Sequence, residues 1–275
     1  MLTLVIYIFI SGPFRKCLLF LYENQITTKY KCIVIPLAEV RIIKLSVLSM
    51  NIRHGRGLDG KVNLKRIAEL LKNSKATIIG LNEVDKYFSR RSNFVDQANW
   101  LASELNMFYV YGPAISLKWA TTREYGNALL SIYPIVQHTN NIFRLTTKIA
   151  EPRSVLEATV NVNERKLKVL VGHFSFHPTL HNRQIEFCLG TDESYPLIIM
   201  GDLNRKPNSS SYKKMVKKYH DCSFNNNDFT FPSKKPKSKI DYIFVNKYFT
   251  VDCANVIKSD ASDHLPVFSK LKLLS

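Results

Sequence analysis

The sequence predicts an α/β protein in which helices cover two packed β-sheets, and three observations support this fold class. Short apolar runs of strand length alternate with amphipathic helical stretches from residue 42 onward. Polar motifs follow several of these runs where the predicted strand ends, which is where α/β folds build their sites. The content of 45% hydrophobic and 11% aromatic residues suits a large core and argues against disorder as the main state.

The predicted elements follow one another without a visible sequence repeat, which indicates one continuous domain. Apolar runs predict strands at 42–50, 77–81, 108–111, 126–132, 155–161, 166–171, 197–200, 240–245 and 267–273. Apolar stripes predict two helices, one through Leu64, Ile67, Leu70 and Leu71 and one through Val95, Ala98, Leu101 and Leu105. A third helix is expected around 181–189.

Residues 1–41 are interpreted as an extension of uncertain structure that precedes a domain of residues 42–275. Two apolar stretches within residues 1–22 are interrupted by Arg15 and Lys16 before they reach the length of a membrane-crossing helix. A signal peptide would also need positive charge before the apolar run. We therefore expect a cytoplasmic protein, with membrane association through residues 1–22 as the alternative.

The composition narrows the class of partner. Lys and Arg outnumber Asp and Glu by 39 to 22, and the formal charge of +17 favours encounter with polyanions such as nucleic acid or anionic lipid. A Lys-rich solvated surface explains the same excess equally well. The five cysteines lie far apart and form no Cys-x-x-Cys pair, so free thiols in a reducing compartment are expected.

Five short polar motifs at predicted strand ends carry the candidate chemistry. A carboxylate that emerges from a buried strand can supply oxygen to Mg²⁺ or Mn²⁺, and a buried acid needs a partner such as an imidazole. Each motif alone is better explained as a turn or a solvated strand end, but five in series indicate one site. They are Asn51 in 49–54, Glu83 in 77–85, Asp202 and Asn204 in 201–204, Asp241 in 239–244, and Asp263 and His264 in 262–267.

Together with His173, these motifs resemble the endonuclease/exonuclease/phosphatase superfamily, which includes pancreatic deoxyribonuclease, apurinic endonucleases, sphingomyelinases and inositol polyphosphate phosphatases. The resemblance runs from about Ile42 to Leu273 and is most specific in Gly-Asp-Leu-Asn at 201–204 and Ser-Asp-His at 262–264. It implies a four-layer α/β sandwich, with two packed mixed β-sheets flanked by helices. Asn82 stands where relatives usually carry Gln.

The resemblance also implies a metal centre built on this set. Glu83 would be the principal ligand of Mg²⁺ or Mn²⁺, and Asn51 and Asp263 would lie near the ion. Asp202 would orient or activate the attacking water. A metal and a carboxylate suit this chemistry because attack on a phosphate diester must overcome anionic repulsion.

The remaining residues are implied to act on the phosphate. Asn204 would hold a phosphate oxygen, and His264 would contact the scissile phosphate while Asp241 fixes its ring. His173 and Arg153 look like the family's second histidine and its phosphate-facing arginine. The implied catalytic set is therefore His173, Asp202, Asn204, Asp241 and His264, and the phosphate-binding set is Arg153, Asn204, His173 and His264.

Three functions are compatible with these observations. The first is a divalent-metal-dependent phosphodiesterase, endonuclease-like, that attacks phosphate esters in line with water. The second is a phosphatase or phosphodiesterase that acts on phosphoinositides, other lipids or small molecules. The third is a non-catalytic binding module. The expected partners are a phosphate-ester substrate, nucleic acid included, and a membrane surface touched by the extension; no obligate protein partner is expected.

Other patterns in the sequence point elsewhere. Residues 55–60 match G-x-G-x-x-G, but the helical stripe begins only at Leu64, beyond the third glycine, which argues against a dinucleotide site. Histidines recur every four residues from His173 to His181, but Pro178 interrupts the helix that a zinc site would need. Several lysines precede Asp241, and they could either attract the phosphate of a substrate or form an ordinary solvated loop. They are Lys234, Lys235, Lys237 and Lys239.

Overall fold

The computed structural model describes residues 6–10, 16–20, 33–36, 42–118, 121–147, 149–223 and 228–274. The chain divides into two units, residues 1–41 and residues 42–274. The first unit contains an antiparallel sheet in the order β1 (Ile6–Ile10), β2 (Lys16–Phe20) and β3 (Ile33–Pro36). The segment 1–22, predicted as the alternative membrane contact, lies partly outside the described residues. Among the residues that are described, no helix is long and apolar enough to cross a membrane.

The second unit is built on two mixed β-sheets of six strands each. The first sheet has the order β14-β15-β4-β5-β7-β6, in which only β4 and β5 pair in parallel. Its strands are β4 (Ile43–Asn51), β5 (Ile78–Lys86), β6 (Phe108–Leu117), β7 (Arg123–Ser131), β14 (Phe249–Val256) and β15 (Val267–Leu273).

The second sheet has the order β12-β13-β11-β10-β9-β8, and its one parallel pair is β10 with β11. Its strands are β8 (Ile135–Phe143), β9 (Arg153–Val162), β10 (Arg165–His173), β11 (Leu197–Asp202), β12 (His220–Asp221) and β13 (Asp241–Val245). Each sheet therefore places one parallel pair near its centre, and Asn51, His173 and Asp202 are the last residues of β4, β10 and β11.

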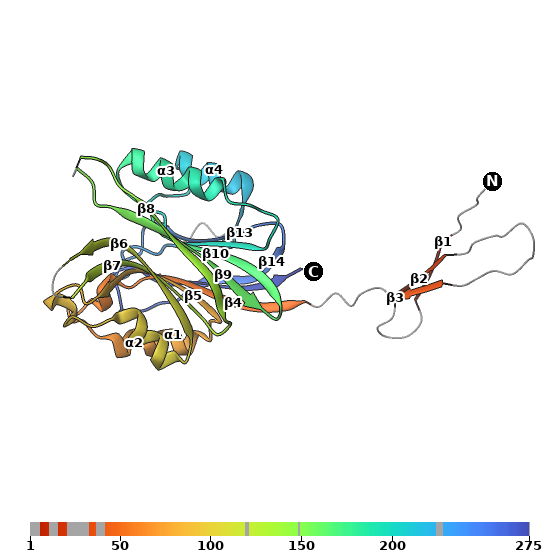
Figure 1. Cartoon of the computed structure of the whole chain (residues 1–275), viewed down its shortest axis with the longest axis horizontal. Helices are drawn as coiled ribbons and strands as arrows, with labels where there is room; N and C mark the ends of the chain where they lie inside the picture. Colours follow the sequence, from red (N-terminus) through yellow and green to blue (C-terminus); the bar gives the residue numbers. More distant parts are fainter. Residues whose placement is uncertain are drawn as a thin grey trace, which may run out of the picture. The chain divides into compact units, whose positions relative to one another are not determined.

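Two helices cover the outer face of each sheet, which completes four layers (Figure 1). The helices α1 (Leu64–Ser74) and α2 (Gln97–Leu105) cover the first sheet, and α3 (Pro178–Leu189) and α4 (Ser210–Lys218) cover the second. Separate apolar clusters fill the space between the sheets and the space under each helix pair. The predicted four-layer α/β sandwich is confirmed.

The helices form where capping and periodicity agree. Asn63 caps α1 by accepting a hydrogen bond from the Arg66 amide, and Ile67 and Leu71 are buried against the sheet. Burial of each such side chain stabilises the fold by about 1.5–3 kcal/mol. The second helix begins later than its apolar stripe suggested, because Asp96 caps it and Val95 precedes the cap.

Two features of the strands differ from the prediction. The strand predicted at 77–81 continues to Lys86, because a β-bulge at Asn82 and Glu83 lets β5 resume its pairing with β7. Strands β8 and β14 were not predicted, because much of each strand is polar and exposed and gives no apolar run. Glu83 is thus presented by a bulge within a strand and not by a strand end.

Gly201 lies in β11, directly before Asp202. Its φ of +138° is one that side-chain-bearing residues rarely adopt, and a Cβ there would lie 1.9 Å from the carbonyl oxygen of Gly172. Gly172 is its register partner on β10. The close approach of β10 and β11 at this point therefore requires glycine.

We predict that Gly201→Ala destabilises the protein by more than about 2 kcal/mol, because the methyl group meets backbone that cannot move aside. Urea denaturation followed by circular dichroism measures the change. Gly190→Ala is the matched control, since Gly190 has ordinary φ of −80° at the end of α3. Equal stability of the Gly201→Ala variant and the parent would contradict this account of the strand contact.

The histidines near α3 do not form a metal site on a helix face. Pro178 occupies the first turn, His177 is the N-cap, and His181 is 2% exposed with its Nδ1 3.1 Å from the carbonyl oxygen of Ser175. Burial, and then the positive charge of Arg205, lower the pKa of His181 from 6.5 to about 4. The folded protein therefore holds this imidazole neutral.

We predict that His181 makes stability depend on pH between about 6.5 and 4. The folded-state pKa lies below the unfolded value, so the contribution is fully present above pH 6.5 and is lost as the pH falls toward 4. The free energy of unfolding of the His181→Gln variant should fall less steeply over this window than that of the parent. Parallel pH profiles for the two proteins would contradict this prediction, because they would show that His181 titrates alike in the folded and unfolded states.

Candidate functional site

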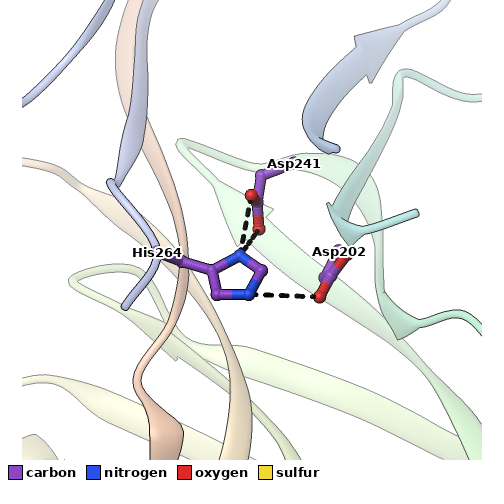
Figure 2. A group of neighbouring side chains, drawn as sticks. All are labelled: Asp202, Asp241 and His264. Atoms are coloured by element: carbon purple, nitrogen blue, oxygen red, sulfur yellow. Dashed lines mark hydrogen bonds and ion pairs between the residues drawn. The ribbon is translucent and has the colours of Figure 1, made fainter. Parts of the chain in front are cut away.

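The centre of the site is His264 held between two buried aspartates (Figure 2). Its Nδ1 lies 2.9 Å from Oδ2 and 3.1 Å from Oδ1 of Asp241, the first residue of β13. Its Nε2 lies 3.8 Å from Oδ2 of Asp202, the last residue of β11. Asp202 and Asp241 are register partners on neighbouring strands, so the sheet itself sets the spacing of the two carboxylates.

Electrostatics within this cluster favour a charged imidazole. Burial alone would lower the pKa of His264, but the Asp241 charge and hydrogen bond, together with Asp202 and Asp263, raise it to about 10. Burial, and then the charge of Asp241, raise the pKa of the Asp202 carboxyl well above its ordinary value. The two buried aspartates thus keep the His264 imidazole protonated, and His264 carries the positive charge of the cluster.

Asn51 links this cluster to the first sheet. Its Nδ2 donates to Oε1 of Glu83 at 3.0 Å and to Oδ2 of Asp202 at 3.3 Å. Its Oδ1 accepts the Arg53 amide at 3.0 Å, and the Arg53 Nε lies 3.3 Å from Oδ2 of Asp263. The Asn51 carboxamide therefore connects the carboxylates of β5 and β11, and Arg53, which it also binds, pairs with Asp263 in the loop before β15.

A strained bulge in β5 presents Glu83. Its φ of +57° lies in the left-handed region, and the β5–β7 register shifts between Leu81 and Val84. Such a conformation costs a non-glycine residue of order 1–3 kcal/mol and persists where the surroundings fix it. Here the bulge aims the Glu83 carboxylate at Asn51 while Asn82 turns toward the second sheet.

A chain of buried amides, which the sequence did not reveal, fixes Asp202. Asn82 Oδ1 accepts the backbone N–H of Asp202 at 3.0 Å, and its Nδ2 donates to Asn127 Oδ1 at 2.8 Å. Asn127 in turn donates to the carbonyl and hydroxyl of Ser154. Asn127 and Ser154 stand in apolar runs typical of core strands, and nothing local marks them. Asn204 adds a backbone donor to Asp202 Oδ1 at 2.8 Å.

His173 and Arg153 complete the wall of the site. The Nε2 of His173 lies 3.5 Å from Oδ2 of Asp202, and burial followed by the charges of Arg153 and His264 lowers the His173 pKa well below 6.5. Arg153 pairs with Glu151 and is 9% exposed. Its Nε is buried without a hydrogen-bond partner among the described residues. This arginine therefore has donor capacity that the protein does not use.

The structure brings all the predicted residues into one place. A cavity of about 590 Å³ is lined by Glu83, Arg153, His173, Asp202, Asn204, Asp263 and His264, among others. Asn51 and Asp241 stand behind it as hydrogen-bond partners of lining residues. The sequence did not indicate Arg53 as the partner of Asp263, or Gln184, whose amide holds the carbonyl of His173 at 3.1 Å. The roles inferred from the resemblance stay predictions.

Solved structures of similar fold come from several organisms. An endonuclease/exonuclease/phosphatase protein of Beutenbergia cavernae aligns at 22% identity and a TM-score of 0.72, over 84% of this chain and 72% of that one. A mannosyl-6-phosphatase of Bacteroides thetaiotaomicron aligns at 20% identity and 0.65, over 82% and 99%. The human Nocturnin catalytic domain, solved with bound sulfate, aligns at 18% identity and 0.64, over 86% and 97%. At these identities the likeness shows the fold.

Sequence comparison adds the family. A search of curated protein sequences gives no match. The family model for the Endonuclease/Exonuclease/phosphatase family matches residues 48–264, which span every strand-end motif described above. The chain therefore belongs to the endonuclease/exonuclease/phosphatase family, whose members are generally hydrolytic enzymes.

Proposed function

We propose that this protein hydrolyses phosphate esters with a divalent cation, Mg²⁺ or Mn²⁺, and that its preferred substrates are phosphodiesters. The observation that carries the proposal is the arrangement of His264 between Asp241 and Asp202, beside Glu83 and Arg153 in one cavity. The cavity combines carboxylates that can aim water with cationic donors that can neutralise phosphate oxygens.

The donor set of the site fits a hard cation. Glu83 and Asp263 offer carboxylate oxygen atoms, which Mg²⁺ and Mn²⁺ prefer, and Asn51 holds the Glu83 carboxylate through its Nδ2. Within the described part of the chain, the Glu83 carboxylate accepts a hydrogen bond from Asn51 alone, so most of its capacity is unused. When bound there, the cation would neutralise charge on the phosphate and on the leaving oxygen. Glu83 would hold it, supported by Asn51 and Asp263.

A second group could also hold an ion, since ligand atoms of Asp202, Asp241 and His264 lie within 4.8 Å of one another. We favour Glu83 because a hydrogen bond already explains the second group: Nδ1 of His264 is bound to Asp241 and its pKa is raised. A metal ligand must be a deprotonated imidazole nitrogen. The cluster therefore acts as a proton-bearing unit.

In the hydrolytic step, each residue around the scissile phosphate has its own role. Asp202, whose Oδ1 is fixed by the Asn204 amide, orients water through Oδ2 and takes its proton as the new P–O bond forms and the bond to the leaving oxygen breaks. His264 donates from Nε2 to a phosphate oxygen, with its ring held by Asp241. The leaving oxygen takes up a proton from solvent water as it departs, and Asp202 then returns its proton to solvent, so each turnover consumes one water.

Three further groups support phosphate binding. Arg153 has a buried Nε with no partner in the described residues, which suits a phosphate oxygen. Asn204 lines the cavity with its carboxamide held by the carbonyl of Phe174 at 2.8 Å. His173, kept neutral by burial and neighbouring charge, can donate or accept one hydrogen bond beside Asp202.

A phosphomonoesterase is the second candidate. The Bacteroides thetaiotaomicron protein of similar fold is a mannosyl-6-phosphatase, which supports a small phosphate ester as the alternative substrate type. The same catalytic groups would serve a monoester or a lipid headgroup. For the remaining partners, contact of residues 1–41 with a membrane surface and the absence of an obligate protein partner stay predictions.

We predict that purified protein nicks supercoiled plasmid in Mg²⁺ or Mn²⁺ and that EDTA abolishes nicking. Glu83→Gln keeps the shape of the side chain but removes its charge, so the rate should fall at least about a hundredfold. Glu186→Gln is the matched control, because Glu186 is exposed and pairs with Lys214 on the surface. Hydrolysis of phosphate monoesters without nicking would establish the second candidate; nicking that survives EDTA would contradict the metal assignment.

We predict a separate effect for Asp241→Asn, which removes the carboxylate that binds Nδ1 of His264. The pKa of His264 should fall and kcat should fall about a hundredfold, with little change in KM, because the imidazole loses its orientation and charge. Asp252→Asn, which removes a surface partner of Lys272, should leave kcat unchanged. Steady-state kinetics with a chromogenic diester provide the comparison. Full kcat in the Asp241→Asn variant would show that catalysis does not need the Asp241 charge on His264.

A further inference from the structure

The cavity continues past the catalytic groups into a second wall that the hydrolytic step does not use. This wall is formed by Phe176, Arg205, Lys206 and Phe231, together with Asn208, Ser209 and Ser238. It joins the loop that follows β10, the loop between β11 and α4, and the loop before β13. A substrate with a single phosphate and a small leaving group would leave this wall unoccupied.

Two cations on this wall have no acidic partner. Arg205 donates from Nη1 to the carbonyl of Asn204 at 2.8 Å and from Nη2 to the carbonyl of Phe176 at 3.0 Å. No carboxylate among the described residues pairs with it or with the exposed Lys206. Arg53 and Arg153, by contrast, both pair with acids in this site. The arginine is thus fixed in position while its charge stays available to an anion.

The same contact fixes an aromatic side chain at the cavity. Phe176 is 69% exposed although it lies two residues after the buried Phe174. The hydrogen bond from Arg205 holds its carbonyl, so the backbone that presents the ring is anchored. Exposing a large apolar ring on an anchored backbone gains nothing in stability, and it offers a flat surface on which a planar group can stack.

Additional positive charge gathers at the third loop. Phe231 and Ser238 pair across this loop and both line the cavity, and the Phe231 ring packs on His264 with centroids 4.7 Å apart. The turn between them exposes Lys234, Lys235 and Lys237. A cavity that holds several carboxylates is therefore bordered by unpaired cations, which suits a substrate with more than one anionic group.

We propose that this wall binds the neighbouring nucleotide of a nucleic-acid strand: its phosphate contacts Arg205 and Lys206, and its base stacks on Phe176. The assignment rests on the proposed phosphate-ester hydrolysis and gives it a substrate class. Nucleic acid satisfies both observations, since adjacent phosphates match the unpaired cations and any base offers a π-face to the phenylalanine.

The test compares two diesters in the same metal buffer. A single-stranded oligonucleotide carries neighbouring phosphates and bases, whereas methyl p-nitrophenyl phosphate carries one phosphate and no planar ring besides its leaving group. We expect Phe176→Ala and Lys206→Ala to lower kcat/KM on the oligonucleotide about tenfold more than on the small diester. Lys213→Ala is the matched control, because Lys213 is an exposed lysine of α4 outside the cavity.

Binding measured without turnover gives an independent readout. Fluorescence anisotropy of a labelled oligonucleotide on the Glu83→Gln protein should show about tenfold weaker binding after Phe176→Ala. Lys206→Ala should reduce the slope of log K against log salt by about 0.7, as expected for one lost phosphate contact on a single strand.

Each outcome decides the assignment. Equal losses on the two diesters, or unchanged anisotropy in both variants, would overturn it while the hydrolytic function stands. Tighter binding to vesicles that contain a phosphoinositide bisphosphate, weakened by the same variants, would assign the wall to a lipid headgroup instead and overturn the nucleic-acid proposal. If neither diester is hydrolysed, the proposed function fails, and the anisotropy alone decides whether the wall binds nucleic acid.

Discussion

The need to stabilise buried carboxylates shapes the centre of this molecule. Asp202 and Asp241 are each 1% exposed, and an unpaired charge at that depth would cost several kcal/mol. The protein meets this demand with one charged imidazole and a set of neutral amides. His264 pairs with both acids, and Asn51 and Asn82 add donors and acceptors around Asp202. Removing His264 would leave both acids with unbalanced charge, and removing either amide would leave a hydrogen-bonding group of Asp202 without its partner.

The two-sheet architecture makes this arrangement attainable. Asn51 and Glu83 belong to the first sheet and Asp202 and Asp241 to the second, so the cluster forms only when the sheets pack face to face. Within the second sheet, Gly201 permits the close backbone approach of β11 to β10 that sets the position of Asp202. The Glu83 bulge redirects one carboxylate out of the regular alternation of β5. The packing of the core therefore determines the distances between the functional groups of the site.

Much of the architecture could be predicted from the sequence because the buried strands of the sheets are strongly apolar. Runs such as 197–200 identify central strands, whereas β8 and β14 are half-exposed and leave no such signal. The residues of the site could be predicted only as a combination of motifs, read through a family resemblance. What no local pattern revealed is the supporting shell: Asn127 and Ser154 look like core residues until the fold places them behind Asp202. Positive φ at Glu83 likewise depends on tertiary packing and not on local propensity.

The account gives distinct tasks to two clusters that lie side by side. In the proposed mechanism Glu83, with Asn51 and Asp263, would hold the cation, whereas Asp202, with Asp241 and His264, would transfer protons. Diffraction from crystals soaked in Mn²⁺, collected for anomalous signal, separates the two assignments directly. The proposed mechanism predicts a single strong peak beside the Glu83 carboxylate. A peak between Asp241 and His264, with none at Glu83, would contradict it.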